Sequence, residues 1–180
     1  MKIGFIGLGN VGAKIAGCIQ RNGYDLWVRD LDRDRAAPFL TSGAYWADSP
    51  REMAENCDMI ITCLPNPAAC SRVLEAEDGV LAGLSGGKIW AEMSTTDAGE
   101  IIRLAELVRA KGAEPIECPV SGGCHRAVTG NISIFAGCSR ETFERVLPIL
   151  AVLGRRILHT GDIGTASILK VMTNYLATAN

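Results

Sequence analysis

The sequence predicts an α/β fold: a Rossmann-type, doubly wound and mainly parallel sheet. Three observations predict it. Short apolar runs alternate with amphipathic stretches along the chain. Several of these runs are continuously apolar, which is typical of strands covered by helices on both faces. A glycine-rich turn, Gly7-Leu8-Gly9-Asn10-Val11-Gly12, directly follows the first run. Strand–helix alternation of this kind gives parallel strands joined by right-handed crossovers.

Eight apolar runs are expected to form the strands of this sheet. They are Lys2–Leu8, Asp25–Arg29, Ala44–Ala47, Asp58–Leu64, Lys88–Glu92, Pro115–Val120, Ile132–Ala136 and Arg156–His159. The first helix is predicted over Val11–Arg21, because Asn22 and Gly23 form a C-terminal capping signal. Its position directly after the glycine-rich turn fits the start of a βαβ unit.

Three longer helices are expected in the second half of the chain. One covers Asp97–Lys111, capped by Thr95 or Thr96 and stopped by a glycine. Another begins after Ser139 and runs to about residue 153, with a proline that should kink it at position 148. The last, Thr165–Asn180, is apolar on much of its surface. We therefore expect it to dock on another domain or on a second subunit.

The composition fits one globular unit. The chain has 180 residues, of which 48% are hydrophobic and 21% charged, and its formal net charge is −2. This balance is too apolar for a disordered chain. The absence of basic blocks argues against nucleic acid as a partner. No apolar run approaches the roughly 18 residues of a membrane span, so no membrane partner is expected.

The seven cysteines are expected to be free thiols. They are Cys18, Cys57, Cys63, Cys70, Cys118, Cys124 and Cys138. Their number is odd and most lie in apolar runs, which favours a reducing compartment and a cytoplasmic protein.

No metal site is expected, because no paired cysteine spacing occurs and only two histidines are present. Ile15-Ala16-Gly17-Cys18 resembles a lipoprotein cleavage box, but polar residues and glycines interrupt the stretch before it.

The motif formed by Gly7, Gly9 and Gly12 has the spacing of a dinucleotide-binding fingerprint. The first glycine permits a tight turn, the second lets the backbone approach a pyrophosphate, and the third allows close packing of helix and strand. The N–H groups of Asn10, Val11 and the following helix turn favour the anion. A glycine-rich turn without a ligand is the alternative, but the motif lies between a predicted strand and a predicted helix, as a dinucleotide site requires.

Asp30 bears on which dinucleotide binds. It ends the second predicted strand, about 20 residues after the motif, where a carboxylate accepts hydrogen bonds from ribose hydroxyls and repels a 2′-phosphate. Arg29, Arg33 and Arg35 complicate this interpretation, because an arginine could reach a 2′-phosphate. Ion-paired surface arginines are commoner, so we expect NAD, with NADP as the alternative.

Three further segments follow predicted strands, at the edge where open α/β sheets bind ligands. They are Leu64-Pro65-Asn66-Pro67, Ser94-Thr95-Thr96 and Pro119-Val120-Ser121-Gly122-Gly123. Each segment alone consists of residue types that are common in turns and loops. Together they indicate a site, in which the hydroxyl of Ser121 and the backbone N–H groups of Gly122 and Gly123 suit a carboxylate.

Lys170 and Asn174 lie four residues apart, on one face of the last predicted helix. Apolar neighbours can lower the pKa of a lysine by desolvation, which suits proton transfer near neutral pH. The alternative is a surface lysine whose stem covers apolar neighbours while its ammonium group stays in water.

These motifs, in this order, resemble the β-hydroxyacid dehydrogenase family, which includes 3-hydroxyisobutyrate dehydrogenase and tartronate semialdehyde reductase. The resemblance runs from residue 2 to the end of the chain and includes the Gly164…Lys170…Asn174 segment. It implies that Lys170 is the catalytic acid/base, that Asn174 orients substrate and lysine, and that Ser121, Gly122 and Gly123 hold the substrate carboxylate. It also implies cofactor contacts from Asn10, Val11, Asp30, Leu64, Pro65 and Thr95.

The resemblance also implies a domain arrangement. Residues 1–163 would form the dinucleotide-binding domain, and residues 164–180 would start an interdomain helix leading to an all-helical C-terminal domain. A homo-oligomer, such as a dimer, would form through that helix and domain. The family often has Asp-Ala before the Pro-Val of the serine loop, where this chain has Glu117 and Cys118.

We therefore expect an oxidoreductase that transfers a hydride between NAD and a small 3-hydroxy acid, or reduces the matching semialdehyde. Thr173 stands where distantly related 6-phosphogluconate dehydrogenases carry a histidine, which argues against that activity. Two alternatives remain open: a non-catalytic NAD(P)-binding module, and an enzyme like the imine reductases. Imine reductases usually replace the lysine, which this chain retains as Lys170.

Overall fold

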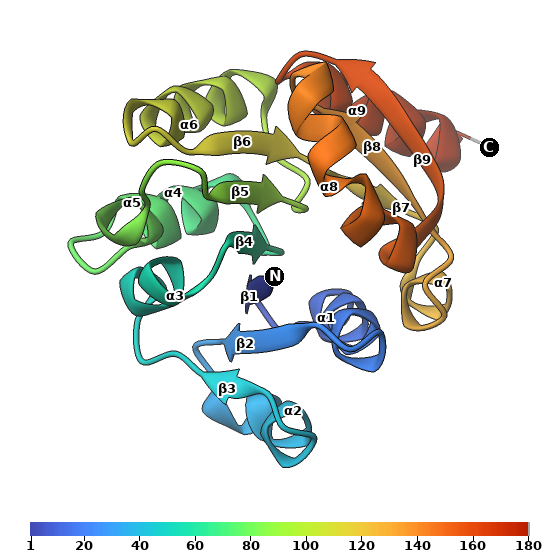
Figure 1. Ribbon diagram of the computed structural model, residues 1–180. Helices are drawn as coiled ribbons and strands as arrows, with labels where there is room; N and C mark the ends of the chain where they lie inside the picture. The colour runs from blue at the N-terminus through green and yellow to red at the C-terminus, as the bar shows by residue number, and fades with distance from the viewer. Residues whose placement is uncertain (180) are drawn as a thin grey trace.

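The computed structural model describes residues 1–179, which form one mixed sheet between two layers of helices (Figure 1). The strands are β1 (Lys2–Ile6), β2 (Asp25–Arg29), β3 (Tyr45–Trp46), β4 (Met59–Thr62), β5 (Ile89–Glu92), β6 (Glu114–Glu117), β7 (Val120–Ser121), β8 (Ile132–Gly137) and β9 (Gly154–Gly161). Their order is β3-β2-β1-β4-β5-β6-β8-β7, with β9 paired to β8. This confirms the predicted fold class.

The helices connect these strands and cover both faces of the sheet. They are α1 (Gly12–Arg21), the 3-10 helix η1 (Arg33–Ala36), α2 (Ala37–Thr41), α3 (Pro50–Asn56), α4 (Pro67–Glu75), α5 (Val80–Gly83), α6 (Ala98–Ala110), α7 (Cys124–Val128), α8 (Arg140–Leu153) and α9 (Thr165–Ala179). The sequence analysis predicted α1, α6, α8 and α9. It did not predict the shorter helices, which have too few turns for a clear apolar period.

Two apolar clusters hold the layers together. One packs α1, α2, α7 and α8 against one face of the sheet, with Phe5 and Ile61 at its centre. The other packs α3 to α6 against the opposite face, around Trp90 and Met53. Successive strand residues alternate between the clusters: Met59 and Ile61 face the first, and Ile60 faces the second. The continuously apolar runs are therefore explained by burial on both faces.

One predicted strand is broken in two. Pro115–Val120 was expected to be continuous, but β6 ends at Glu117 and β7 begins at Val120. Pro119 has no N–H to donate. The parallel pairing with β5 ends at Glu117, whereas the antiparallel pairing with β8 starts at Glu117 and continues at Val120 and Ser121. As a result β7, β8 and β9 extend the sheet past the end of β6, and we call these three strands the strand extension.

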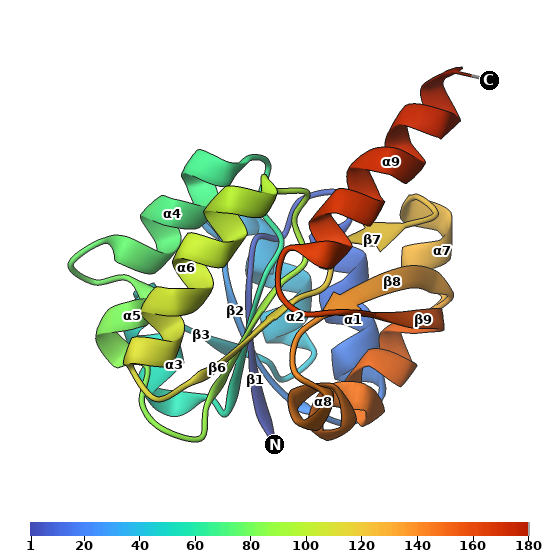
Figure 2. The ribbon, with the colours of Figure 1, turned by 90° about the horizontal axis from the view of Figure 1, so that it is seen from above.

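The last helix projects from the body of the domain on the side of the strand extension (Figure 2). Its first turns are packed, whereas much of its later surface is exposed. The exposed apolar side chains are Ile168, Val171, Met172, Tyr175 and Leu176. An exposed apolar face on the last helix was expected and is confirmed, while its docking partner stays a prediction; Asn180, included in the predicted helix, lies outside the described residues.

The cysteines agree with the expectation of free thiols: all seven are unpaired and five are buried. Cys18, the last residue of the lipoprotein-like box, lies inside α1 and its thiol donates to the backbone oxygen of Ala127 at 3.2 Å. In the part of the chain that the structure describes, no helix is both long enough and apolar enough to cross a membrane.

Candidate functional site

The carboxyl ends of five parallel strands are aligned by their register. Ile6 pairs with Arg29 and with Thr62, and Glu92 pairs with Thr62 and with Glu117. The segments that follow these residues therefore emerge at one edge of the sheet, which we call the ligand edge. The strand order reverses between β1 and β4, and such a switch point is where open α/β sheets bind ligands.

The glycine-rich turn at the ligand edge fits the expected roles of its glycines. Gly7 has φ +102°, and a Cβ there would lie 2.2 Å from the backbone oxygen of Cys63. A Cβ on Gly12 would lie 2.0 Å from the backbone oxygen of Gly7. By contrast, a Cβ on Gly9 would meet only a guanidinium nitrogen of Arg35, at 3.9 Å. Gly7 and Gly12 are thus required by the fold, whereas the space beside Gly9 is open to a ligand.

The N-terminus of α1 presents free donors to that space. The backbone N–H groups of Asn10, Val11 and Gly12 make no hydrogen bond within the described residues, whereas Ala13 already donates to Gly9 at 3.0 Å. These N–H groups lie at the positive end of the helix dipole, which favours an anion. The turn therefore fits the pyrophosphate of a dinucleotide.

Asp30 follows β2 and ties the glycine-rich turn to it. One carboxylate oxygen accepts from the backbone N–H of Leu8 at 2.6 Å, and the other accepts from Asp32 at 3.0 Å. Each oxygen keeps acceptor capacity beyond these bonds. The carboxylate thus lies beside the turn, as expected. It also fixes the backbone of the turn through Leu8, which the sequence did not indicate.

The arginines around Asp30 are mostly engaged elsewhere. Arg29 donates to the backbone oxygen of Ala47 at 2.9 Å, and Arg33 stacks on the ring of Trp46 with 5.0 Å to its centroid. Arg35 pairs with Asp32 at 3.2 Å and is the guanidinium close to Gly9. Of the three arginines considered for a 2′-phosphate, Arg35 is the one beside the glycine-rich turn.

A buried polar network links the next two strand ends. Glu92 accepts from the Thr62 hydroxyl at 2.8 Å and from the Ser94 backbone at 2.7 Å. Ser94 in turn accepts from the backbone N–H of Leu64 at 2.7 Å. Burial raises the pKa of Glu92, although these hydrogen bonds oppose the shift. The network fixes the Leu64-Pro65 turn against the loop after β5.

The loop after β5 places its two threonines differently and corrects one prediction. Thr95 is exposed at the ligand edge, whereas Thr96 is buried and its hydroxyl has no partner within the described residues. Neither threonine caps α6. Asp97 does so, because its carboxylate accepts from Gly99 at 2.9 Å and from Glu100 at 3.1 Å. An aspartate one residue nearer the helix is the better-placed N-cap.

The Ser121-Gly122-Gly123 segment connects β7 to α7. Gly122 has φ +126° and Gly123 has φ +77°, values that side chains other than glycine rarely adopt. A Cβ on Gly122 would also lie 2.9 Å from the side chain of Arg126. Ser121 is half-buried on β7, opposite Ser133 of β8. The loop thus has a backbone conformation that requires its two glycines, while its carboxylate-binding role stays a prediction.

Glu117, at the end of β6, holds the start of α9. Its carboxylate accepts from the backbone N–H groups of Gly164 at 2.6 Å, Ala166 at 2.8 Å and Ser167 at 3.0 Å, and from the Ser167 hydroxyl at 2.5 Å. It is 1% exposed. The sequence analysis noted Glu117 only as a departure from a family pattern. A carboxylate inside the apolar run Pro115–Val120 was the signal that could have revealed it.

Lys170 is buried on the packed side of α9, at 8% exposure, and burial lowers its pKa. Its ammonium group has no hydrogen bond or ion pair with any of the residues 1–179. Asn174 lies one turn further on and is exposed. The low exposure and the lowered pKa fit the catalytic interpretation, which stays a prediction.

Lys170 and Ser121 border the same face of the strand extension. Val120, Ile134 and Ile157 pack against the cluster that includes α1 and α8, so the alternating residues face the opposite side. Helix α9 contacts β8, β9 and α6, and α6 belongs to the other cluster. The helix that carries Lys170 therefore lies on the face that Ser121 shares.

The sequence was compared with protein families and with known proteins. Residues 2–161 match the family described as the NAD binding domain of 6-phosphogluconate dehydrogenase. The chain is 32% identical over 180 residues to 2-(hydroxymethyl)glutarate dehydrogenase of Eubacterium barkeri, covering 100% of this chain and 60% of the relative. It is 33% identical over 174 residues to 3-hydroxyisobutyrate dehydrogenase of Pseudomonas aeruginosa, covering 97% and 58% respectively.

A solved structure agrees with these relatives. The crystal structure of 3-hydroxyisobutyrate dehydrogenase from Salmonella typhimurium superposes with a TM-score of 0.92 and 29% identity, covering 98% of this chain and 62% of that one. The chain thus spans about 60% of the length of the proteins it matches.

Proposed function

This chain belongs to the family of the NAD binding domain of 6-phosphogluconate dehydrogenase, and from that premise we propose that its protein is an NAD-dependent dehydrogenase of a small 3-hydroxy acid. In the other direction it would reduce the matching semialdehyde. The observation that carries the proposal is the buried Lys170, whose pKa burial lowers, on the same side of the strand extension as Ser121. Two relatives are named as dehydrogenases of 3-hydroxyisobutyrate and of 2-(hydroxymethyl)glutarate, which supports this substrate class.

The cofactor would lie along the ligand edge. The N–H groups of Asn10, Val11 and Gly12 would bind its pyrophosphate, and Asp30 would accept from its ribose hydroxyls. Leu64, Pro65 and Thr95 would contact it further along the edge. NAD is proposed rather than NADP, because the Asp30 carboxylate repels a 2′-phosphate and Arg35 is already paired. When bound, the cofactor supplies the hydride acceptor.

The substrate would lie between the serine loop and α9. The hydroxyl of Ser121 and the N–H groups of Gly122 and Gly123 would hold its carboxylate. In oxidation the neutral amine of Lys170 takes the proton of the substrate hydroxyl, and in reduction the ammonium group returns it. Asn174, one turn along the same helix face, would orient the substrate toward the lysine. Holding the carboxylate fixes the reacting carbon relative to both partners.

The test is Lys170→Ala in the full-length protein. We expect kcat for 3-hydroxyisobutyrate to fall by about 10²- to 10⁴-fold, the usual contribution of a general acid/base. NADH affinity should stay nearly unchanged, because the lysine faces substrate. Lys170→Arg should not restore activity, since a guanidinium group stays protonated. In the wild type, kcat for oxidation should rise with pH, because the neutral amine is the active form. The midpoint of that rise should lie below 10.5, the ordinary pKa of a lysine.

Lys111→Ala is the matched control, because Lys111 caps the far end of α6 and is exposed. It should leave both kcat and NADH affinity unchanged. Ser121→Ala should mainly raise KM. A Lys170→Ala enzyme that keeps more than about a tenth of wild-type kcat would refute the catalytic role. Tight NADH binding without turnover would favour a binding module, and turnover of cyclic imines would favour an imine reductase.

A further inference from the structure

The outward face of the strand extension carries a row of polar side chains that the proposed function leaves largely unused. Ser121 pairs with Ser133, and Ser133 pairs with Arg156. Paired residues of neighbouring strands project from the same face. The alternating residues, Ile134 and Ile157, pack against the core on the other face. Ser121, Ser133 and Arg156 thus form a row across three strands, on the side where α9 lies.

A β-bulge at the start of β9 directs the arginine to that face. Ile132 pairs with Gly154, but the next residue, Ser133, pairs with Arg156. Arg155 is the additional residue. In a regular register without the bulge, Arg155 would pair with Ser133 and Arg156 would project toward the core. Bulges are frequent next to active sites, where they re-aim a side chain.

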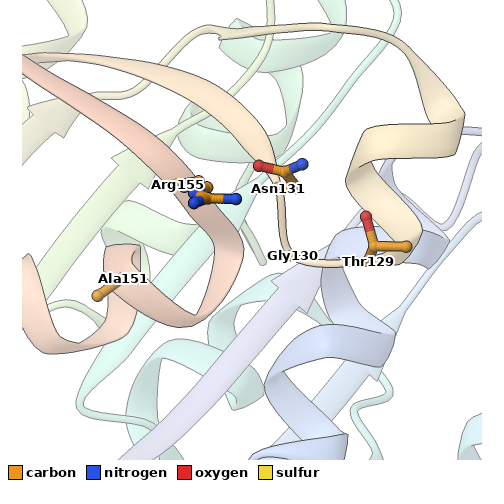
Figure 3. A pocket seen from close by; sticks show the side chains of 6 residues that line it. Thr129, Gly130, Asn131, Ala151 and Arg155 are labelled. Carbon is orange, nitrogen blue, oxygen red and sulfur yellow. The ribbon is translucent and has the colours of Figure 1, made fainter.

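The row lies in a surface hollow of about 590 Å³, whose lining includes Ser121, Ser133, Phe135, Arg155 and Arg156. Arg155 also borders a neighbouring hollow beside Asn131 (Figure 3). Among the described residues, the guanidinium groups of Arg155 and Arg156 make no hydrogen bond or ion pair. Both arginines are exposed, and two guanidinium groups without a carboxylate partner among the described residues therefore border the hollow that contains Ser121.

Both arginines lie at the ligand edge. Because β8 runs antiparallel to β6 and parallel to β9, the beginning of β9 points the same way as the carboxyl ends of the parallel strands. The glycine-rich turn follows β1, whereas both arginines lie on β9, which pairs with β8, the fourth strand from β1 in the sheet order. In the proposed function the molecule beside this hollow is the substrate, because the hollow contains Ser121.

We propose that this hollow binds a second carboxylate of the substrate, held by the guanidinium of Arg156 and the hydroxyl of Ser133. The inference rests on the proposed function, in which Ser121 holds the first carboxylate. Two strand spacings separate the backbones of Arg156 and Ser121 by roughly 10 Å. An arginine side chain and a short dicarboxylate together span that distance, and a guanidinium group binds a carboxylate through two parallel hydrogen bonds. The substrate class is thus a 3-hydroxy acid with a second carboxylate.

The test compares a dicarboxylate substrate, 2-(hydroxymethyl)glutarate, with a monocarboxylate one, 3-hydroxyisobutyrate, in the full-length enzyme. Arg156→Gln should raise KM for the dicarboxylate about tenfold or more, the usual effect of losing a charge-assisted hydrogen bond. KM for the monocarboxylate should change by less than about twofold, since one carboxylate remains held. Arg109→Gln, an exposed arginine at the far end of α6, is the control of equal charge change and should match the wild type.

An equal effect of Arg156→Gln on both substrates, or no effect on either, would overturn the proposal. The arginines would then serve to keep an exposed edge strand from pairing with other chains. Calorimetric titration of the NADH-loaded protein with glutarate separates this failure from that of the proposed function. Glutarate binding that Arg156→Gln abolishes, without turnover of any hydroxy acid, leaves the carboxylate site standing and rejects the dehydrogenase. Turnover of hydroxy acids without any preference for the dicarboxylate keeps the dehydrogenase and rejects the second carboxylate site.

Discussion

The glycine-rich turn after β1 and the strand extension reach the ligand edge in different ways. In the turn, consecutive residues build the site: the spacing of Gly7, Gly9 and Gly12 sets both the backbone and the free N–H groups. In the strand extension, residues distant in sequence meet through pairing, as Ser121 and Arg156 do across β8. A locally encoded site tolerates little change of spacing, whereas a site made by pairing depends on register.

The substitution with the largest expected effect disrupts the glycine-rich turn as a binding site and leaves the fold intact. Gly9→Val places a branched side chain where the pyrophosphate should approach, so NADH affinity should fall by about 100-fold or more. The melting temperature should hardly change, because the space beside Gly9 is open. Calorimetry and thermal unfolding measure the two quantities. Gly86→Val, at an equally open glycine elsewhere in the chain, is the matched control.

Gly12→Val should behave in the opposite way, because a Cβ there would lie 2.0 Å from the Gly7 backbone oxygen. We expect it to lower the free energy of unfolding by about 3 kcal/mol or more, as overpacking does. Unchanged NADH affinity in Gly9→Val would contradict the assignment of the phosphate site. Equal stability of the two variants would contradict the division of roles among the glycines.

A smaller effect is expected where β6 meets α9. Glu117→Gln replaces one carboxylate oxygen with an amide that faces N–H donors, so the start of α9 loses charge-assisted hydrogen bonds worth about 1.5–3 kcal/mol each. The melting temperature and kcat should both fall, with NADH affinity unchanged. Glu117→Asp keeps the charge and should recover part of kcat. A loss of stability without any change in kcat would show that Glu117 does not position Lys170.

The smallest expected effect concerns the choice of cofactor. Asp30→Asn removes the charge that repels a 2′-phosphate, so the preference for NAD over NADP in kcat/KM should shrink several-fold. NADH affinity should also weaken slightly, since the Asp30 carboxylate holds the N–H of Leu8 at 2.6 Å. Asp78→Asn, at an exposed carboxylate between α4 and α5, is the control with the same charge change. A wild-type enzyme equally efficient with NADP would reject the NAD preference and direct attention to Arg35.

The lysine shows where local pattern is insufficient. Apolar neighbours of Lys170 were visible in the sequence, but they also fit a solvated lysine on an amphipathic helix. In the structure α9 packs against β8 and β9, and Lys170 is buried on that side of the helix. Glu117 makes that packing specific by capping the helix from a strand far away in the chain. A contact of that range leaves no periodic signal in either segment.

The sequence by itself determined the fold class, the longer helices, the positions of nearly all strands and the glycine-rich turn. Each of these depends on short-range chemistry: apolar periodicity, capping residues, and positions where a side chain would clash. Only the tertiary structure decided the break between β6 and β7, the antiparallel β8, the bulge at Arg155 and the burial of Lys170. These features depend on which strands pair and which face a helix covers, and pairing between distant segments is a property of the whole fold.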